Sequence, residues 1–89
     1  MTKTKRLRDL LAADGILVSP GVYDGYSVRL VEQMGFKTAC TTGAGMANSR
    51  LGVPDVGIMG LSDNVEACRM IARSVDIPVM ADADTGYGS

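Results

Sequence analysis

The sequence predicts an α/β fold with a parallel sheet, on three observations. Three short apolar runs, 16–19, 37–42 and 77–81, have the composition of strands. Amphipathic segments with helical spacing separate these runs, and glycine or proline residues mark the ends of most elements. Strands that alternate with helices form βαβ units, whose strands lie parallel in one sheet. No further strand closes this sheet, so we expect part of a larger α/β domain.

The N-terminal part of the chain predicts a helix followed by the first strand. An amphipathic helix is expected over residues 5–13, with Gly15 as its stop. Its leucines fall on one helical face: Leu7, Leu10 and Leu11. The first strand is expected at 16–19, where the apolar run "ILVS" precedes Pro20. Such a run is typical of a parallel strand that is buried on both faces.

The second helix and the second strand follow in the same order. Asp24 is expected to cap the helix, because its carboxylate can accept hydrogen bonds from the first backbone N–H groups, and Gly35 fits the C-terminal stop. Apolar residues recur at helical spacing between them: Val28, Val31 and Met34, with Leu30 beside them. The second strand is expected at 37–42. A glycine-bearing loop follows it, in which residues 46–50 can form one helical turn.

The third helix and the third strand complete the chain. Ser62 can cap this helix, and Asp63 and Glu66 lie in its first turn, where carboxylates complement the helix dipole. Its apolar face comprises Val65, Cys68, Ile71, Ala72 and Val75. The third strand is expected at 77–81, with Pro78 near its start, where a missing N–H is tolerated.

Composition indicates a globular protein and excludes several classes of partner. The 89 residues suffice for one small core, and 46% hydrophobic with 21% charged residues is ordinary for a globular domain. Nine basic and ten acidic residues give a net charge of −1, so we expect neither nucleic acid nor a membrane as a partner. Histidine, the side chain most used for acid–base catalysis near neutral pH, is absent from the sequence.

We expect a cytoplasmic protein without a membrane segment. No apolar run is long enough to span a bilayer, and charges interrupt the basic N-terminus, which therefore differs from a secretory signal. Cys40 and Cys68 lie in different expected elements and lack CxxC spacing. We therefore expect two reduced, buried thiols.

Two aspartates, Asp82 and Asp84, follow the third expected strand. Residues i and i+2 of a strand point to the same side, so both carboxylates would project together from the carboxyl edge of the sheet, where parallel α/β folds place their sites. Two carboxylates held together repel unless a cation lies between them or one is protonated. Mg²⁺ or Mn²⁺ would resolve this repulsion, because both prefer oxygen ligands. The alternative is that one aspartate caps the following turn and the other is solvated.

A second candidate feature is "TTGAG", residues 41–45, at the end of the second expected strand. Small residues there let backbone N–H groups approach an anion, and Thr42 adds a hydroxyl. The usual nucleotide-binding fingerprints are absent, and a flexible turn without a ligand is the alternative. Asp55, in "GVPDVG", is by itself typical of a solvated or capping loop carboxylate.

Taken together, "TTGAGMANSRLGVPDVG" and, about one helix later, "IPVMADADTGYGS" resemble the isocitrate lyase/phosphoenolpyruvate mutase superfamily. The likeness is greater to its branch of 2-methylisocitrate lyase, oxaloacetate decarboxylase and dimethylmalate lyase, and extends to sequences described as carboxyvinyl-carboxyphosphonate phosphorylmutase. It covers essentially the whole chain, and "LGVPD" with "DADTGYG" makes a specific pair. The resemblance implies a (β/α)₈ TIM barrel. Residues 1–89 would be the N-terminal part of this single domain, holding its first three βα units.

The resemblance also implies roles for individual residues. Asp82 occupies the position that binds Mg²⁺ directly, at the substrate, and Asp84 the position that holds the ion largely through water. Asp55 matches a catalytic-loop aspartate that supports the closed active site. The turn that holds the substrate carboxylate through backbone N–H groups is matched by Thr42, Gly43 and Ala44. Cys40 departs from the family, which often has an aromatic residue there, near the substrate.

The implied activity is Mg²⁺-dependent C–C bond cleavage of a small 2-hydroxy or 2-oxo di- or tricarboxylate, of the methylisocitrate, dimethylmalate or oxaloacetate type, through an enolate. A mutase or hydrolase acting on the P–C bond of a phosphonate is the alternative within the superfamily. An inactive truncated fragment is the third possibility. The family's acid–base loop and a further metal-holding glutamate would lie beyond residue 89. We therefore expect the 89-residue chain alone to be inactive and a longer parent to be a homotetrameric enzyme.

Overall fold

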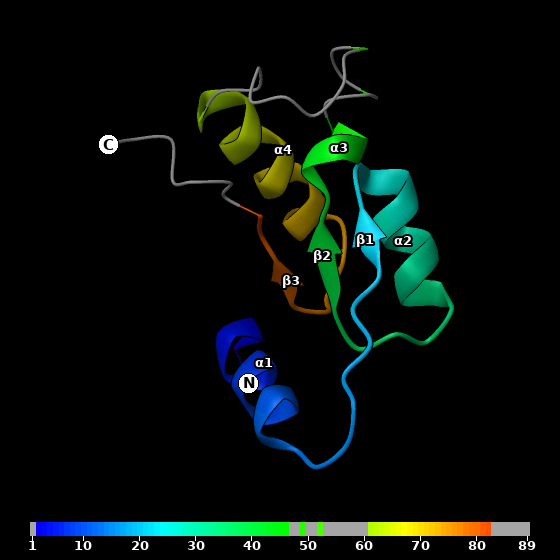
Figure 1. Ribbon diagram of the computed structural model, residues 1–89, viewed down its shortest axis with the longest axis vertical. Coiled ribbons are helices and arrows are strands. Elements are labelled where there is room, and N and C mark those ends of the chain that lie inside the picture. Colours follow the sequence, from blue (N-terminus) through cyan, green and yellow to red (C-terminus); the bar gives the residue numbers. More distant parts are fainter. Residues whose placement is uncertain (1, 47–48, 50–51, 53–60, 83–89) are drawn as a thin grey trace.

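In the computed structural model (Figure 1), three parallel strands form one sheet, and two helices cover one of its faces. The described residues are 2–46, 49, 52 and 61–82. The helices are α1 (Lys3–Ala12), α2 (Gly25–Gln33), α3 (Gly43–Met46) and α4 (Leu61–Arg73). Helices α2 and α4 pack on the sheet, whereas α1 lies near the amino ends of the strands. None of the helices in the described part of the chain has the length and hydropathy needed to cross a membrane.

All strand pairs in the described sheet are parallel, in the order β1–β2–β3. The strands are short: β1 (Gly21–Val22), β2 (Ala39–Thr41) and β3 (Val79–Met80). Cys40 of β2 lies opposite Gly21 on one side and Met80 on the other. The predicted α/β fold with a parallel sheet is thus confirmed. Because the strands run the same way, the segments that follow β2 and β3 leave the sheet at one edge.

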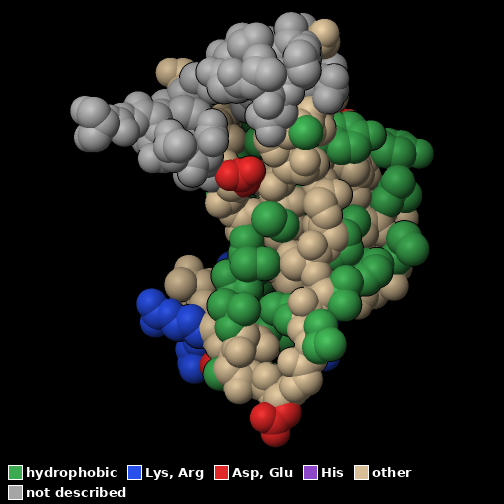
Figure 2. All heavy atoms as spheres, viewed as in Figure 1, with side chains coloured by type: hydrophobic (Ala, Val, Ile, Leu, Met, Phe, Trp, Pro, Cys, Tyr) green, Lys and Arg blue, Asp and Glu red, His purple; other side chains and the backbone are tan. Residues whose placement is uncertain are grey.

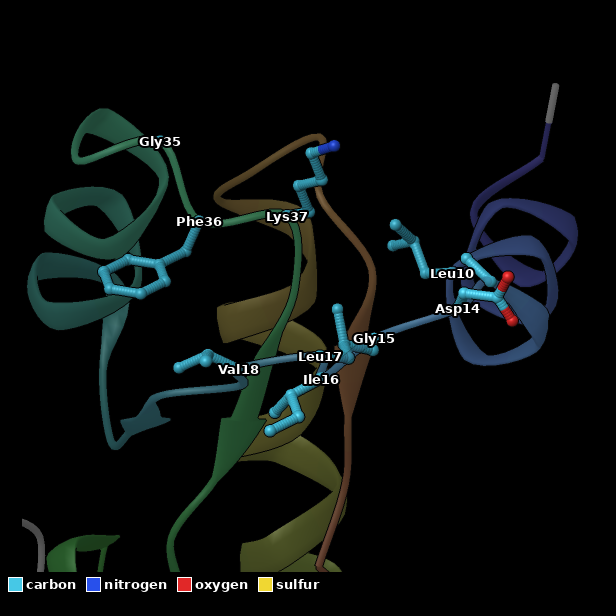
Figure 3. A pocket seen from close by; sticks show the side chains of 10 residues that line it. Leu10, Asp14, Gly15, Ile16, Leu17, Val18, Gly35, Phe36 and Lys37 are labelled. Carbon is cyan, nitrogen blue, oxygen red and sulfur yellow. The ribbon is translucent and has the colours of Figure 1, made fainter.

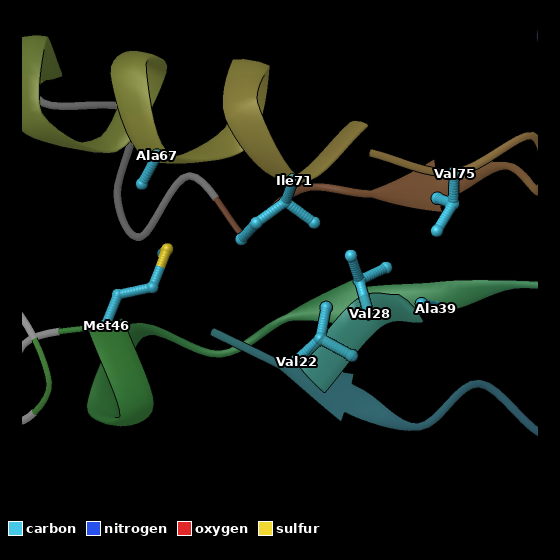
Figure 4. Packing of buried hydrophobic residues seen from close by; sticks show 7 residues of the cluster. All are labelled: Val22, Val28, Ala39, Met46, Ala67, Ile71 and Val75. Carbon is cyan, nitrogen blue, oxygen red and sulfur yellow. The ribbon is translucent and has the colours of Figure 1, made fainter. Parts of the chain in front are cut away.

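The hydrophobic core lies between the sheet and helices α2 and α4 (Figure 4). Side chains alternate along a strand, and Val22 and Ala39 face the helices. Val28 of α2 and Ile71 of α4 meet them there, and all four side chains are fully buried. The core is completed by Met46, Ala67 and Val75. The expected apolar faces of the second and third helices are therefore confirmed at Val28 and Ile71.

The strand expected at 16–19 is wrong in position. β1 consists of Gly21–Val22 instead, and Ile16 and Val18 are 94% and 57% exposed. The pairing with β2 starts at the carbonyl oxygen of Pro20, which accepts a hydrogen bond from the Cys40 N–H at 2.9 Å. Proline lacks an N–H but keeps its carbonyl, so it can open a strand as well as end one.

Three side chains expected on apolar helix faces are largely exposed. They are Leu11 (61%), Met34 (75%) and Val65 (44%). In α4, the helix begins at Leu61, so Ser62 lies inside its first turn rather than at the cap. The buried stripe of α4 includes Asn64, where we expected Val65. Figure 2 accordingly shows hydrophobic side chains at the surface, over the strands and along α2.

The expected cap of the second helix is confirmed. Asp24 Oδ1 accepts a hydrogen bond from the Ser27 N–H at 2.7 Å, and Ser27 Oγ accepts one from the Asp24 N–H at 3.2 Å. This reciprocal capping box satisfies backbone donors at the start of α2. Gly35, with φ of 92°, follows the C-cap residue Met34 in the left-handed conformation that glycine adopts most easily. Both ends of α2 are thus encoded locally.

Helix α1 is joined to the end of α4 by two basic side chains. Lys3 Nζ donates to the carbonyl oxygens of Ala72 and Val75, at 2.6 and 2.7 Å. The guanidinium of Arg6 donates to the Asp76 carbonyl oxygen at 3.0 Å. No side chain of α1 is buried, so polar contacts contribute much of its attachment. A cation at a helix C-terminus also complements the helix dipole.

Replacing Lys3 with methionine is expected to lower the free energy of unfolding by about 1–2 kcal/mol, since two partly buried charge-assisted hydrogen bonds are lost. Urea denaturation followed by circular dichroism measures this change. Lys5→Met is the matched control. The Lys5 side chain forms an exposed salt bridge with Asp9, at 3.5 Å. Exposed salt bridges contribute little, so we expect Lys5→Met to lower the free energy of unfolding by about 0.5 kcal/mol or less. Equal effects of the two substitutions would contradict this role for Lys3.

Candidate active site

The candidate site lies at the carboxyl edge of the sheet, where the segments after β2 and β3 meet. Asp82 comes two residues after the end of β3 and is exposed. Thr42, Gly43 and Ala44 directly follow β2. Asp55 and Asp84, the other predicted site residues, lie outside the described part of the chain. The described structure therefore positions four of the six predicted site residues.

A hydrogen bond joins the two segments directly. The Asp82 N–H donates to Thr41 Oγ1 at 2.8 Å. Asn64, on the first turns of α4, donates from Nδ2 to the Asp82 carbonyl oxygen at 3.1 Å. Thr41 and Asn64 are 3% and 5% exposed. The segment that follows β3 is thus joined to the end of β2 and to α4 by contacts on both sides of Asp82.

Sequence reasoning missed Asn64, and it considered Thr41 only as part of "TTGAG" and Cys68 only as a buried thiol. Cys68 Sγ lies 3.6 Å from Asn64 Oδ1 and 3.9 Å from Thr41 Oγ1, and its single S–H can donate to one of them at a time. A signal was present in the sequence. Cys68 and Ile71 follow Asn64 by four and seven residues, so the three side chains share one face of the helix. The polar amide of Asn64 therefore interrupts an apolar stripe.

The segment after β2 is a helix rather than the expected loop. Helix α3 begins at Gly43, which is earlier than the turn expected at 46–50. Thr42 stands at its N-cap position: Thr42 Oγ1 accepts from the Gly45 N–H at 3.3 Å, and the Thr42 carbonyl accepts from the Met46 N–H at 2.9 Å. The threonine hydroxyl, expected to face a ligand, therefore serves as a cap, and small residues permit a tight turn at this edge.

Gly45 has no room for a side chain. A Cβ atom built there would lie 2.7 Å from Thr42 Cγ2 and 3.0 Å from Tyr23 Cβ. Gly45→Ala should therefore lower the free energy of unfolding by about 1–3 kcal/mol, as overpacking does. The better helix propensity of alanine offsets only about 1 kcal/mol of the strain. Thermal unfolding measures the change.

The matched control for Gly45→Ala is the double variant with Thr42→Ser. Serine keeps the capping hydroxyl and removes the Cγ2 methyl group that a new Cβ would meet. The double variant should therefore recover at least about 0.5 kcal/mol relative to the sum of the single changes. Strict additivity would show that the Thr42 methyl group is not the cause.

The two cysteines occupy different sides of the sheet. Cys68 is on α4, on the helix-covered side, and Cys40 alternates with Ala39 and Thr41, so it faces the other side. Both are free thiols, as predicted, but both are only partly buried, which corrects the expectation of full burial. Cys40 faces away from α2 and α4 because its neighbours in β2 contribute to the core.

The described residues fit a hard metal ion in kind but supply only one carboxylate. Asp82 offers oxygen donors at the sheet edge, and Mg²⁺ often takes one or two protein carboxylates and fills its remaining positions with water and substrate oxygens. Within the described residues, no group of three or more His, Cys, Asp or Glu side chains is close enough to hold a metal. Asp82 therefore fits such an ion as one ligand among several.

A pocket of about 420 Å³ lies at the other end of the strands, on the side where they begin (Figure 3). Its lining includes Leu10, Ile16, Leu17 and Phe36, with Asp14 as its one carboxylate. These residues precede the strands rather than follow them. Parallel α/β folds place active sites at the carboxyl ends of strands. This pocket is therefore separate from the candidate site.

Comparison with known proteins shows similarity across nearly the whole chain. The sequence model of a family described as phosphoenolpyruvate phosphomutase matches residues 7–89. 2,3-Dimethylmalate lyase from Eubacterium barkeri is 35% identical over 89 residues, which are 100% of this chain and 31% of that protein. The chain thus spans less than a third of the length of this relative.

Solved structures agree with the sequence matches. Oxaloacetate acetylhydrolase superposes with a TM-score of 0.92 at 46% identity, covering 99% of this chain and 32% of that one. Phosphonopyruvate hydrolase, solved in complex with oxalate and Mg²⁺, superposes with a TM-score of 0.92 at 35% identity, covering 99% and 31%. The described fold of three parallel strands is therefore shared with longer enzymes that act on small carboxylates or phosphonates.

Proposed function

Because the chain belongs to the phosphoenolpyruvate phosphomutase family, within the PEP mutase/isocitrate lyase superfamily, we propose that it is the N-terminal part of a carbon–carbon lyase. Its substrate is a small 2-hydroxy or 2-oxo di- or tricarboxylate of the methylisocitrate, dimethylmalate or oxaloacetate type. The observation that carries this proposal is the joining of Asp82 to the end of β2, at the carboxyl edge of a parallel sheet. Relatives that are lyases support it.

We place the three described strands as the first three of a (β/α)₈ barrel, with residues 1–89 as the N-terminal part of that single domain. The parallel order β1–β2–β3 and the similarity of the chain to about a third of longer structures support this placement. In such barrels the carboxyl ends of the strands carry the active site. The whole protein is proposed to be a homotetramer in the cytoplasm, with no nucleic-acid or membrane partner.

Asp82 and Asp84 would hold Mg²⁺, or Mn²⁺, at this edge. The exposed carboxylate of Asp82 has the donor chemistry that these ions prefer. A similar structure, phosphonopyruvate hydrolase, was solved in complex with Mg²⁺ and oxalate, which supports the same metal here. When bound, the ion supplies positive charge that polarises a substrate oxygen beside the bond that breaks.

The remaining site residues orient the substrate. Backbone N–H groups of the turn Thr42–Ala44 would bind one substrate carboxylate, except that of Thr42, which donates to the Val22 carbonyl oxygen at 2.9 Å. The Thr42 hydroxyl instead holds the turn in shape by accepting from the Gly45 N–H. Asp55 is proposed to support a loop that closes over the site. For a 2-oxo substrate such as oxaloacetate, loss of CO₂ leaves the electron pair of the broken C–C bond on the carbon next to the carbonyl, as the enolate of the 2-oxo acid product. For a 2-hydroxy substrate, the hydroxyl loses its proton and becomes the carbonyl of the 2-oxo acid, and the electron pair stays on the carbon next to the carboxylate of the other product, as its enolate.

The proposal is tested with two proteins: the 89-residue chain, and the longer parent protein of which we propose it to be the N-terminal part. Methylisocitrate, dimethylmalate and oxaloacetate are each supplied with and without Mg²⁺, and release of the 2-oxo acid product is measured. We expect turnover of one of the three by the parent protein, dependent on the metal, and none by the 89-residue chain alone. Absence of turnover of all three by the parent would contradict the lyase assignment.

A phosphonate reaction is the second candidate. The matching family is described as phosphoenolpyruvate phosphomutase, and phosphonopyruvate hydrolase is similar over 99% of this chain. Cys40 would also leave more space than an aromatic residue at the substrate. The longer parent protein is incubated with phosphonopyruvate, and the products are assayed. Free phosphate would indicate hydrolysis of the P–C bond, and phosphoenolpyruvate would indicate rearrangement, whereas a C–C lyase should form neither.

A further inference from the structure

The backbone of Asp82 is held on both sides, although it lies outside the strand ladder. The ladder between β2 and β3 pairs Cys40 with Met80 and ends there. Beyond it, the Asp82 N–H donates to Thr41 Oγ1 at 2.8 Å, and the Asp82 carbonyl oxygen accepts from Asn64 Nδ2 at 3.1 Å. These bonds orient the peptide groups before and after Asp82 Cα. They therefore restrict φ and ψ of this residue together.

The two side chains that hold Asp82 are nearly buried, whereas Asp82 itself is exposed. Thr41 is 3% exposed because it faces the helix-covered side of the sheet, and Asn64 is 5% exposed on the face of α4 that carries Ala67 and Ile71. A polar side chain in such surroundings is costly unless it is hydrogen-bonded. Both side chains make a bond to the Asp82 backbone.

The amide of Asn64 is itself held in one orientation. Its Oδ1 lies 3.6 Å from Cys68 Sγ, one turn further along α4, and its Nδ2 points to the Asp82 carbonyl. The reverse orientation would place the amide oxygen against the Asp82 carbonyl oxygen, two acceptors together. Cys68 therefore favours the orientation in which Asn64 donates to Asp82.

We propose that Thr41 and Asn64 are positioning residues that set the metal affinity of the candidate site by fixing the backbone of Asp82. The inference rests on the proposed role of Asp82 as a metal ligand. With φ and ψ restricted, the Asp82 carboxylate moves only about χ1 and χ2, so less conformational entropy is lost when it binds an ion. Partners that orient a metal ligand typically change affinity by about 10- to 100-fold.

The test measures Mn²⁺ binding to the purified protein by electron paramagnetic resonance. Thr41→Val and Asn64→Leu each remove one bond to Asp82 while keeping the number and branching of the side-chain heavy atoms. Each should weaken Mn²⁺ binding by about 10-fold or more. Thr41→Ser keeps the hydroxyl and should restore the affinity. If Thr41→Val does not fold, Asn64→Leu carries the test from α4.

Thr38→Val is the matched structural control. Thr38 is fully buried, and its Oγ1 donates to the Pro78 carbonyl oxygen at 3.0 Å, so it also joins β2 to the β3 segment, but at the amino end. Thr38→Val and Thr41→Val should both lower the melting temperature, yet only Thr41→Val should weaken Mn²⁺ binding. Equal Mn²⁺ affinities in Thr38→Val, Thr41→Val, Asn64→Leu and the unmodified protein would overturn the proposal.

The variant Asp82→Asn separates this inference from the proposed function. If Asp82→Asn leaves the Mn²⁺ affinity unchanged, Asp82 is not a metal ligand. That result would overturn both the proposed metal role of Asp82 and the positioning role of Thr41 and Asn64. Affinity that falls in Asp82→Asn but not in Thr41→Val or Asn64→Leu would overturn the positioning role alone. A second readout needs no metal: hydrogen exchange of the Asp82 N–H, followed by NMR, should be faster in Thr41→Val than in Thr38→Val.

Discussion

Ile71→Ala is expected to lower the free energy of unfolding by about 2–5 kcal/mol, a large effect for a core of this size. Ile71 is fully buried and is among the largest fully buried side chains of the described residues. It stands where α4 meets the sheet, together with Val22 and Val28 (Figure 4). Removing most of its side chain leaves a cavity between layers that short strands hold only weakly. Urea denaturation at constant m-value measures the loss.

Ile16→Ala is the matched control, because the same atoms are removed from a side chain that is 94% exposed. We expect a change within about 0.5 kcal/mol. A loss at Ile16 comparable with that at Ile71 would mean that the first predicted strand, 16–19, is buried after all. The pair of substitutions therefore tests the position of β1 as well as the packing of α4.

The ends of α2 and two of the three strands could be predicted from the sequence, since β2 and β3 lie within the expected runs 37–42 and 77–81, whereas the first strand could not. Asp24 caps α2 through contacts with residues three positions away, which sequence spacing records directly. The prediction of a strand at 16–19 was wrong because an apolar run suggests that a segment is buried but does not say which residues pair with a neighbouring strand. Pairing depends on the register with β2, which sets Gly21 opposite Cys40. That register is a property of two segments and appears in neither alone.

The same distinction applies to the candidate site. Asp82 could be predicted because a carboxylate after a buried strand falls at the functional edge of a parallel sheet. Thr41 and Asn64 act on it from positions 41 and 18 residues away in the chain, through side-chain bonds to its backbone. No motif spacing encodes such a contact. The interruption of the apolar stripe of α4 by Asn64 was the one local sign of it.

In the longer parent protein, Asp82→Asn should lower kcat/KM for the proposed metal-dependent reaction by more than about 100-fold. Outer partners of a metal site already contribute about 10- to 100-fold, so a direct ligand should reach at least the upper limit. Asparagine has nearly the same shape and keeps the backbone bonds to Thr41 and Asn64, but it lacks the negative charge that attracts the ion. Steady-state kinetics over a range of Mg²⁺ concentrations measure the effect, which should shrink as Mg²⁺ rises.

Asp76→Asn is the control for this loss of charge, because Asp76 is also exposed but precedes β3 instead of following it. Its backbone N–H donates to Glu32 Oε2 at 2.7 Å, a bond that the substitution keeps. Activity and Mg²⁺ dependence should therefore be unchanged in Asp76→Asn. If Asp82→Asn has the same kinetics as the unmodified protein at limiting Mg²⁺, the metal role of Asp82 is contradicted. The loss of charge would then have no effect at either end of β3. A loss confined to Asp82 would instead locate the chemistry at the carboxyl edge, where β2 and α4 hold its backbone.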